Sequence, residues 1–223
     1  MTINPDSAIV FSAGPLRINA TIFFTWVVMA LLAGVSAWVS AGLSSGPKIS
    51  RWQSALETVY EFISGQIKSV TGGDPTPYVP FLGALGLFIL TANLMEAVPL
   101  FHTPTSSLSA TFALSVSVFF AVPFFAIARS GPAAYLRSYF SPNPFMFPFH
   151  IISELSRTVS LAVRLFGNMM SEGLIAGVLL SIVPLFVPVA MQLFGLIIGA
   201  VQAYIFFTLA TVYIGAAASA HKE

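Results

Sequence analysis

The chain contains no cysteine and very little charge. Without cysteine it can form no disulfide, no thiolate metal site and no thiol nucleophile, and its three histidines are too scattered for metal-ligand spacing. Charged residues make up 8% of the 223 residues, about a third of the share in an ordinary soluble domain. Nine Lys and Arg against eight Asp and Glu leave a net charge of +1, with no basic cluster suited to nucleic acid. The composition therefore excludes redox, zinc and nucleic-acid functions.

Long apolar runs take the place of charge, and 57% of the residues are hydrophobic. About 20 consecutive apolar residues span the hydrocarbon core of a bilayer. Five segments satisfy this length: 19–43, 78–101, 107–128, 149–182 and 187–219. The last two are separate because a helix cannot continue unchanged through Pro184 and Pro188. The sequence therefore predicts an all-α polytopic membrane protein with about five transmembrane helices, which ends in a long helical hairpin.

Two segments outside these crossings are not uniformly apolar. Across 47–70, apolar residues recur at helical spacing with charged residues between them: Ile49, Trp52, Leu56, Val59, Tyr60, Ile63 and Ile67. This pattern predicts an amphipathic helix on a membrane surface. Residues 1–18 are polar and carry Asp6 without a basic leader, so we expect an external segment and no cleaved signal peptide.

The basic residues predict the orientation, because cytoplasmic loops are enriched in Lys and Arg. Five crossings place the two termini on opposite sides of the membrane. With the N-terminus outside, six basic residues become cytoplasmic: Lys48, Arg51, Lys68, Arg129, Arg137 and Lys222. Only Arg17 is then outside. We therefore predict an external N-terminus, a cytoplasmic C-terminus and a surface helix on the cytoplasmic side.

Arg157 and Arg164 lie inside the crossing 149–182. A charge near the bilayer centre costs about 2.5–3.5 kcal/mol, so it needs a partner, a water-filled cavity or a function. Helical geometry places several polar residues on the same face: Ser153, Arg157, Ser160, Arg164, Asn168 and Ser171. This polar stripe could line an aqueous path, face a partner with carboxylates, or hydrogen-bond neighbouring helices.

An ion pair of Arg164 with Glu154 or Glu172 is the structural alternative. Each carboxylate is about 12–15 Å from Arg164 along the helix axis, so direct pairing within the helix is not expected. The crossing 149–182 has 34 residues, about 51 Å of helix against a core of about 30 Å, which predicts a strong tilt. The last crossing carries a small, polar face suited to close helix packing, formed by Gln192, Gly195, Gly199 and Gln202.

Residues 153–173, SELSRTVSLAVRLFGNMMSEG, closely resemble the signature of subunit a of the rotary F-type ATP synthase. In that family RLFGNM contains an essential arginine, which maps onto Arg164, and the family's asparagine maps onto Asn168. The segment VQAYIFFTLATVYIGAA at 201–217 resembles the family's last helix, with Gln202 at its glutamine position.

The resemblance covers most of residues 50–219, since 80–99 and 103–115 also resemble family segments in the same order. Some positions depart from the family pattern. Glu172 follows Arg164 by eight residues where the family commonly has an acidic or histidine residue at nine, and Gly195 stands where His or Glu is frequent. Glu96 and Ser107 also depart from it. These features suggest a divergent branch, the bacterial N-type ATPases, some of which are linked to sodium.

The resemblance implies an ion-translocating stator subunit with two half-channels beside a rotor ring of subunit c. It couples the flow of H⁺, or of Na⁺, to ring rotation and to ATP synthesis or hydrolysis. Arg164 would separate the half-channels. The further half-channel candidates are Glu172, Gln202 and Tyr204 on the outer side, Glu154 and Arg157 on the inner side, and Asn168 and Ser160 on the stripe. Glu96 either joins the outer vestibule or lies at the interface as a helix-end charge.

The family also implies a peripheral-stalk partner, subunit b, a bacterial inner membrane with its lipid, and no cofactor. The chain has no G-x-x-x-x-G-K-[ST] loop, so ATP chemistry must belong to its partners and no catalytic site of its own is expected. A structural role for Glu154 remains an alternative, and His150 is interpreted as interfacial. An ion-coupled secondary transporter is the competing hypothesis, although the sequence lacks the internal repeat of many such folds.

Overall fold

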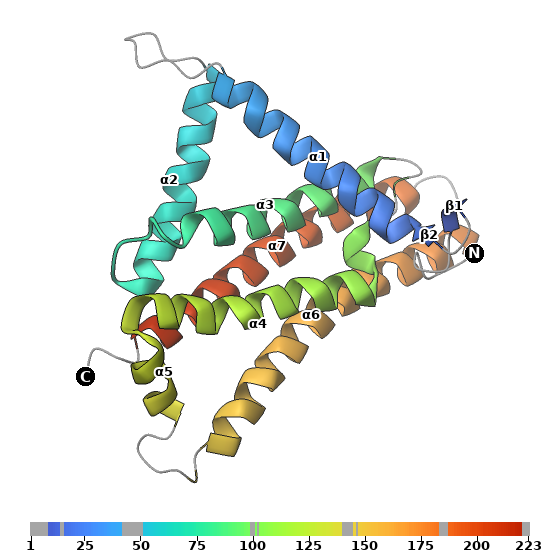
Figure 1. The fold of residues 1–223 in the computed structure, drawn as a ribbon. Coiled ribbons are helices and arrows are strands. Elements are labelled where there is room, and N and C mark those ends of the chain that lie inside the picture. The colour runs from blue at the N-terminus through green and yellow to red at the C-terminus, as the bar shows by residue number, and fades with distance from the viewer. Residues whose placement is uncertain are drawn as a thin grey trace.

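The structure is a computed structural model that describes residues 9–13, 16–41, 51–98, 101, 103–139, 145, 147–182 and 187–219. Its elements follow one another as shown in Figure 1. A short antiparallel hairpin comes first, formed by β1 (Ile9–Ala13) and β2 (Leu16–Asn19). The helical elements are α1 (Ala20–Ala41), α2 (Arg51–Thr71), α3 (Val79–Leu94), η2 (Met95–Ala97), η3 (Pro104–Ser106), α4 (Leu108–Ser130), α5 (Pro132–Tyr139), α6 (Phe147–Ile182) and α7 (Val187–Ser219).

Four helical segments are long and apolar enough to cross a membrane: Ala20–Ala41, Val79–Ala97, Leu108–Ser130 and Val189–Ala218. The fifth predicted crossing, α6, is 36 residues long and is set apart by charged side chains along its length. These helices confirm the prediction of an all-α polytopic membrane protein, to which the structure adds the β1–β2 hairpin. The chain is a multi-pass membrane protein.

The observed helices follow the predicted segments with somewhat different ends. The helix α2 (Arg51–Thr71) covers the described part of the amphipathic segment predicted at 47–70, whose first four residues lie outside the described part. The segment 78–101 contains a shorter helix, because α3 ends at Leu94 and the one-turn helix η2 follows it. The structure also contains α5 and the β1–β2 hairpin, which were not predicted because they are short elements without a long hydrophobic period.

The helices form a bundle with one helix across its end. In Figure 1, α3, α4 and α7 run alongside one another, α6 is inclined to them, and α2 lies across the end where the C-terminus is found. On α2, Trp52, Tyr60 and Phe62 are exposed while Ile67 is fully buried. The exposed aromatic residues fit an amphipathic helix, and its place at a membrane surface stays a prediction.

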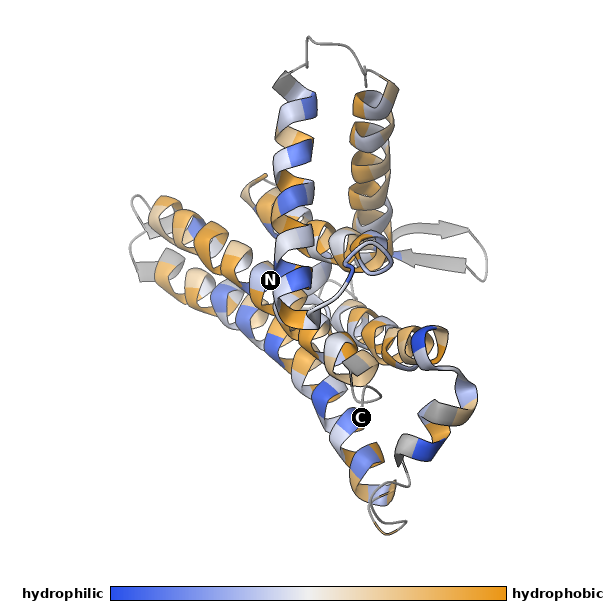
Figure 2. Cartoon of the chain, turned by 90° about the vertical axis from the view of Figure 1, so that its left-hand side faces the viewer, coloured by the Kyte–Doolittle hydropathy of each residue, from blue (hydrophilic) through white to orange (hydrophobic). Residues whose placement is uncertain are grey.

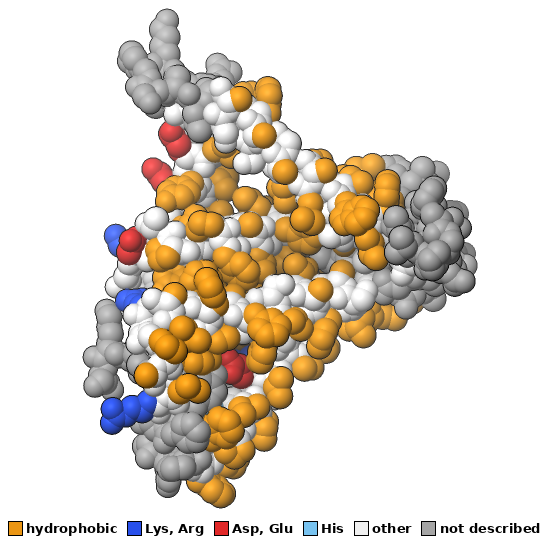
Figure 3. All heavy atoms as spheres, in the orientation of Figure 1, with side chains coloured by type: hydrophobic (Ala, Val, Ile, Leu, Met, Phe, Trp, Pro, Cys, Tyr) orange, Lys and Arg blue, Asp and Glu red, His pale blue; other side chains and the backbone are white. Residues whose placement is uncertain are grey.

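The core lies between α3, α4, α6 and α7, with Ile67 of α2 added to it. It contains Leu82, Leu85, Ile89, Val118, Leu161, Leu165, Phe206, Phe207 and Ile214. Many other large hydrophobic side chains are exposed, and Figure 3 shows them spread over the helices while most visible charges lie along the edge of α2 and α5. Such a surface is suited to lipid on its apolar band and to water at its charged edge.

A tight turn connects α2 to α3. Gly72 adopts a positive φ of 60°, a conformation that glycine takes without steric cost, and its N–H donates to the Lys68 carbonyl oxygen over 2.9 Å. Asp74 then accepts hydrogen bonds from the backbone N–H and the hydroxyl of Thr76, at 3.0 and 2.6 Å. These bonds lower the pKa of Asp74. The turn reverses the chain from the surface helix into the bundle.

Asn93 and Gly199 bring α3 and α7 close together. The Asn93 Nδ2 donates to the Gly199 carbonyl oxygen over 2.9 Å, and its Oδ1 accepts from the Thr105 hydroxyl at 2.7 Å. Asn93 is buried, so its amide needs these partners. A Cβ added at Gly199 would lie 2.8 Å from the Asn93 Cβ. Glycine is therefore required at this helix contact.

We predict that Gly199→Ala destabilises the protein, because the added methyl overlaps Asn93 and pushes α7 away from α3. Overpacking of this kind costs about 1–3 kcal/mol, which a thermal-unfolding scan of the detergent-purified protein measures as a lower Tm. The matched control is Gly34→Ala, since nothing lies within 4 Å of a Cβ added there. Equal Tm values for the two variants would contradict this packing.

Candidate functional site

The predicted polar stripe forms an open face of α6. All six residues of the stripe are exposed: Ser153, Arg157, Ser160, Arg164, Asn168 and Ser171. Figure 2 shows hydrophilic residues recurring along this helix. The opposite side of α6 packs into the bundle, where Leu161, Leu165 and Met169 are buried. The helix therefore attaches to the bundle through apolar side chains and leaves Arg157 and Arg164 exposed.

Arg164 lies near the middle of the open face. Within the described residues, no carboxylate of this chain forms an ion pair with its guanidinium, so neither Glu154 nor Glu172 pairs with it. Leu161 and Leu165 beside it on the helix are buried, which fixes the direction in which Arg164 projects. The guanidinium stays protonated at any accessible pH. The face therefore presents a permanent positive charge.

Toward the end of α6 that joins α7, a cavity of about 390 Å³ lies between η2, α6 and α7. We call it the Glu172 cavity. Its lining residues are Glu96, Ala97, Glu172, Gly173, Ala176, Gly177, Met191, Gln192, Gly195 and Leu196. Glu96 therefore faces the same space as Glu172, although the two residues are far apart in sequence. Small residues of α6 leave the cavity open.

Glu172 fits against the bare backbone of Gly195. A Cβ added at Gly195 would overlap the Glu172 carboxylate, so α6 can bring this side chain against α7 only because residue 195 is glycine. The Glu172 Oε2 atom is buried and has no hydrogen-bond partner within the described chain. A buried carboxylate oxygen normally binds a donor or an ordered water. This atom is thus available to water or to a mobile proton in the cavity.

Asn168 connects the open face to the interior. Its Nδ2 donates to the Oε1 of Gln202 over 2.7 Å, and Gln202 is only 2% exposed. The Nε2 of Gln202 is buried and finds no acceptor among the described residues. Asn168 is one helical turn from Arg164 and one from Glu172. The amide pair therefore lies between the fixed cation and the Glu172 cavity.

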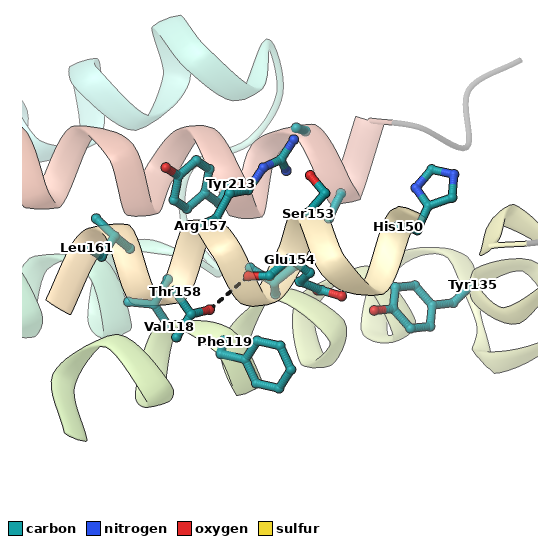
Figure 4. A pocket seen from close by; sticks show the side chains of 13 residues that line it. Val118, Phe119, Tyr135, His150, Ser153, Glu154, Arg157, Thr158, Leu161 and Tyr213 are labelled. Atoms are coloured by element: carbon teal, nitrogen blue, oxygen red, sulfur yellow. Dashed lines mark hydrogen bonds between the residues drawn. The ribbon is translucent and has the colours of Figure 1, made fainter. Parts of the chain in front are cut away.

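Near the start of α6 and the end of α7, a second cavity of about 290 Å³ opens between α4, α5, α6 and α7 (Figure 4). We call it the Arg157 cavity. Its polar lining comes from Tyr135, His150, Ser153, Glu154, Arg157, Thr158 and Tyr213. The Arg157 guanidinium carbon lies 5.4 Å from the centre of the Tyr213 ring, a cation–π distance that holds the cation at the cavity wall.

The two cavities lie on opposite sides of Arg164 along α6. Arg157 precedes Arg164 by seven residues and Glu172 follows it by eight, which correspond to about 10 and 12 Å of helix. Carboxylates dominate the charge of one cavity, whereas the other contains Arg157, Glu154 and His150. Ser160 lies on the open face between Arg157 and Arg164. Polar space therefore approaches the central cation from both ends.

Tyr204 lies against the surface helix α2, and its place in the outer half-channel stays a prediction. Its hydroxyl is 3.4 Å from Gln66 Oε1, and its ring packs near Phe62, both on α2. Two residues along a helix turn the side chain by about 200°, so Gln202 and Tyr204 point to opposite sides of α7. Tyr204 attaches the surface helix to the bundle.

Comparisons with known proteins agree over nearly the whole chain. The family model of the ATP synthase A chain matches residues 22–215. The chain belongs to the ATP synthase subunit a family. It is 51% identical to "ATP synthase subunit a 2" of Picosynechococcus sp., over all of this chain and 96% of that protein. It is 52% identical to "ATP synthase subunit a 1" of Chlorobaculum tepidum, over 97% of this chain and 98% of that protein.

Membership of the subunit a family confirms the resemblance stated from residues 153–173. It also confirms the predicted function, that of an ion-translocating subunit within an ATP synthase complex. The "ATP synthase subunit a" of Albidiferax ferrireducens is 51% identical over all of this chain and 96% of its own length. The secondary-transporter alternative is not favoured.

Sequence reasoning missed two polar residues that build this part of subunit a. Asn93 and Thr105 gave no periodic pattern, and only the fold brings them to Gly199. Gln192 was predicted as part of a packing face, whereas in the structure its Nε2 donates to the Ala97 carbonyl oxygen over 2.8 Å. Asn93, Thr105 and Gln192 each place an uncharged amide or hydroxyl within an apolar segment. Such a group is costly in lipid unless it has a hydrogen-bond partner, and this cost could have marked all three residues.

We predict that Gly195→Ala impairs ATP-driven ion pumping in vesicles carrying the whole complex. The new methyl displaces the Glu172 carboxylate, and misplacing a working group by about 1 Å can reduce a rate tenfold or more. Gly173→Ala is the matched control, because it lines the same cavity yet has nothing within 4 Å of an added Cβ. Equal pumping by the two variants, at equal amounts of assembled complex, would show that Glu172 does not need this position.

Proposed function

We propose that this subunit a conducts ions through two offset half-channels that end on either side of Arg164. One observation carries the proposal: an arginine without an ion-pair partner in the described chain lies midway along an exposed polar face, between two cavities. An uncovered charge in a membrane helix is unstable against lipid. It requires a partner with the opposite charge, and the ionised carboxylate of a neighbouring ring subunit c supplies one.

In this proposal Arg164 acts as an electrostatic gate. At an effective dielectric constant near 20, opposite charges about 4 Å apart attract by about 4 kcal/mol, and desolvation offsets part of this. Arg164 therefore attracts the empty ring carboxylate and repels a passing cation. Ions cannot move directly from one half-channel to the other, so they must travel with the ring.

The outer half-channel includes Glu96, Glu172, Asn168 and Gln202. The Glu172 cavity supplies its entrance, and the Asn168–Gln202 bond continues the polar path toward Arg164. Two buried polar atoms without partners among the described residues, Glu172 Oε2 and Gln202 Nε2, support a hydrated route. Carboxylates in this position hold and release the ion on its way to the ring.

The inner half-channel includes Glu154, Arg157 and Ser160. Figure 4 shows Arg157 directed toward Tyr213 on α7 and Glu154 on the side of Phe119 and Tyr135. The Arg157 cavity opens near the C-terminal end of α7. An ion released by the ring would pass Ser160 and this cavity. His150 is at the mouth of the cavity and serves as an interfacial residue.

The proposal also assigns surroundings and orientation. The open face of α6 contacts the ring of subunit c, and subunit b of the peripheral stalk belongs to the same complex. The membrane is a bacterial inner membrane, with the β1–β2 hairpin outside and the C-terminus in the cytoplasm. Lys68, Arg129 and Arg137 then lie on the cytoplasmic side, as the distribution of basic residues in membrane proteins requires.

The translocated ion is H⁺ or, for a member of the N-type branch, Na⁺. No cofactor takes part in the proposed path. ATP synthesis measured in vesicles at low and at high sodium separates the two ions, because only a sodium-coupled complex requires Na⁺.

We predict that Arg164→Gln abolishes both ion-driven ATP synthesis and ATP-driven pumping in vesicles that contain the assembled complex. Glutamine keeps the approximate length and polarity of the side chain but removes the charge that gates the path. Arg137→Gln is the matched control, since Arg137 is an exposed arginine of α5, outside the stripe. It retains both activities. Full coupling by Arg164→Gln would return Arg164 to a structural role.

A further inference from the structure

Gln192 makes a long-range contact at the edge of the Glu172 cavity. Its Nε2 donates to the carbonyl oxygen of Ala97 over 2.8 Å, linking α7 to η2 across 95 positions of sequence. Ala97 is the last residue of η2 and directly follows Glu96. Gln192 and Glu96 both line the cavity. The hydrogen bond therefore fixes the backbone next to the Glu96 side chain.

The Ala97 carbonyl needs such a partner. The last carbonyl groups of a helical segment find no N–H donor within the helix, and an unpaired backbone group away from water costs several kcal/mol within a membrane. η2 ends at this point, and the chain becomes extended at Val98. Without Gln192, the unpaired Ala97 carbonyl would favour a rotation of η2 toward water, and this rotation would move Glu96 as well.

The charges around the Glu172 cavity also favour movement of Glu96. Glu96 from η2 and Glu172 from α6 are its titratable lining residues, and no charged residue of α7 lines it within the described chain. When both carboxylates are ionised, they repel each other across the cavity that they share. Glu172 packs against the backbone of Gly195, so separation of the two carboxylates would move Glu96. A tie from α7 to η2 opposes that movement.

We propose that Gln192 is a positioning residue that holds Glu96 opposite Glu172 in the outer half-channel. The inference rests on the proposed function, since it concerns the delivery of ions to Arg164. Gln192 acts through the backbone at Ala97 rather than by carrying the ion. The Gln192 side chain is exposed and lines the Glu172 cavity. A substitution there therefore removes the hydrogen bond to Ala97 without disturbing a packed core.

A double-mutant cycle tests the proposal in vesicles with the whole complex. Gln192→Leu removes the donor with little change in volume and lowers ATP-driven ion pumping about three- to tenfold, the effect of one lost hydrogen bond. Glu96→Gln lowers pumping as well. Because Gln192 acts through Glu96, adding Gln192→Leu to Glu96→Gln produces no further loss. Multiplicative losses in the double variant would overturn the proposal.

The variant Gln192→Glu adds a readout that general damage to the fold would not change. At low pH on the outer side, a protonated Glu can still donate to the Ala97 carbonyl, so pumping stays near that of the unmodified complex. At high outer pH the ionised side chain cannot donate and repels Glu96 and Glu172, so pumping falls. Gln192→Leu is impaired at every pH. An unchanged pH profile for Gln192→Glu would refute the positioning role.

Two controls separate this inference from the proposed function. Gln53→Leu makes the same chemical change on α2, where Gln53 bonds Glu57 at 3.0 Å, and leaves pumping unchanged. Glu172→Gln tests the half-channel itself. If Glu172→Gln pumps normally, the outer half-channel and the role of Gln192 both fail. If Glu172→Gln is impaired while Gln192→Leu pumps normally, the half-channel stands and only the positioning role is refuted.

Discussion

The cost of keeping a guanidinium within a membrane helix governs the arrangement of this protein. One side of α6 packs against the bundle through Leu161 and Leu165, and Arg164 is left on the open face. The rest of the chain holds that face in place. Such a helix is incomplete alone, because its exposed cation needs a partner of opposite charge. Its structure is that of one half of an interface.

Close helix contacts decide where the polar groups meet. Gly195 admits the Glu172 carboxylate, and Gly199 admits Asn93. Because α7 lacks side chains at these two positions, α3 and α6 both approach it closely, and polar atoms from three helices gather beside the apolar core. The same glycines therefore serve packing and ion conduction. This explains why a helix as apolar as α7 can form one wall of a polar path.

The membrane crossings and the polar stripe could be predicted from the sequence alone, whereas the contacts between helices could not. Hydrophobic length gave the crossings, and helical periodicity gave the stripe with Arg164 at its centre. Pairing across helices could not be predicted, so the partnership of Glu172 with Gly195, and of Gln192 with Ala97, came only from the fold. The contact of Tyr204 with Gln66 also came only from the fold, because a helix turns by about 200° between residues 202 and 204 and directs the two side chains to opposite sides of α7.

The most direct measurement is disulfide cross-linking of single-cysteine variants to a cysteine in the ring subunit. The chain has no cysteine of its own, so each introduced thiol reports one position. Ser160→Cys and Ser171→Cys on the open face should cross-link to the ring, whereas Ala162→Cys on the buried side should not. Cross-linking from Ala162→Cys, with none from the two serine positions, would show that the stripe does not face the rotor.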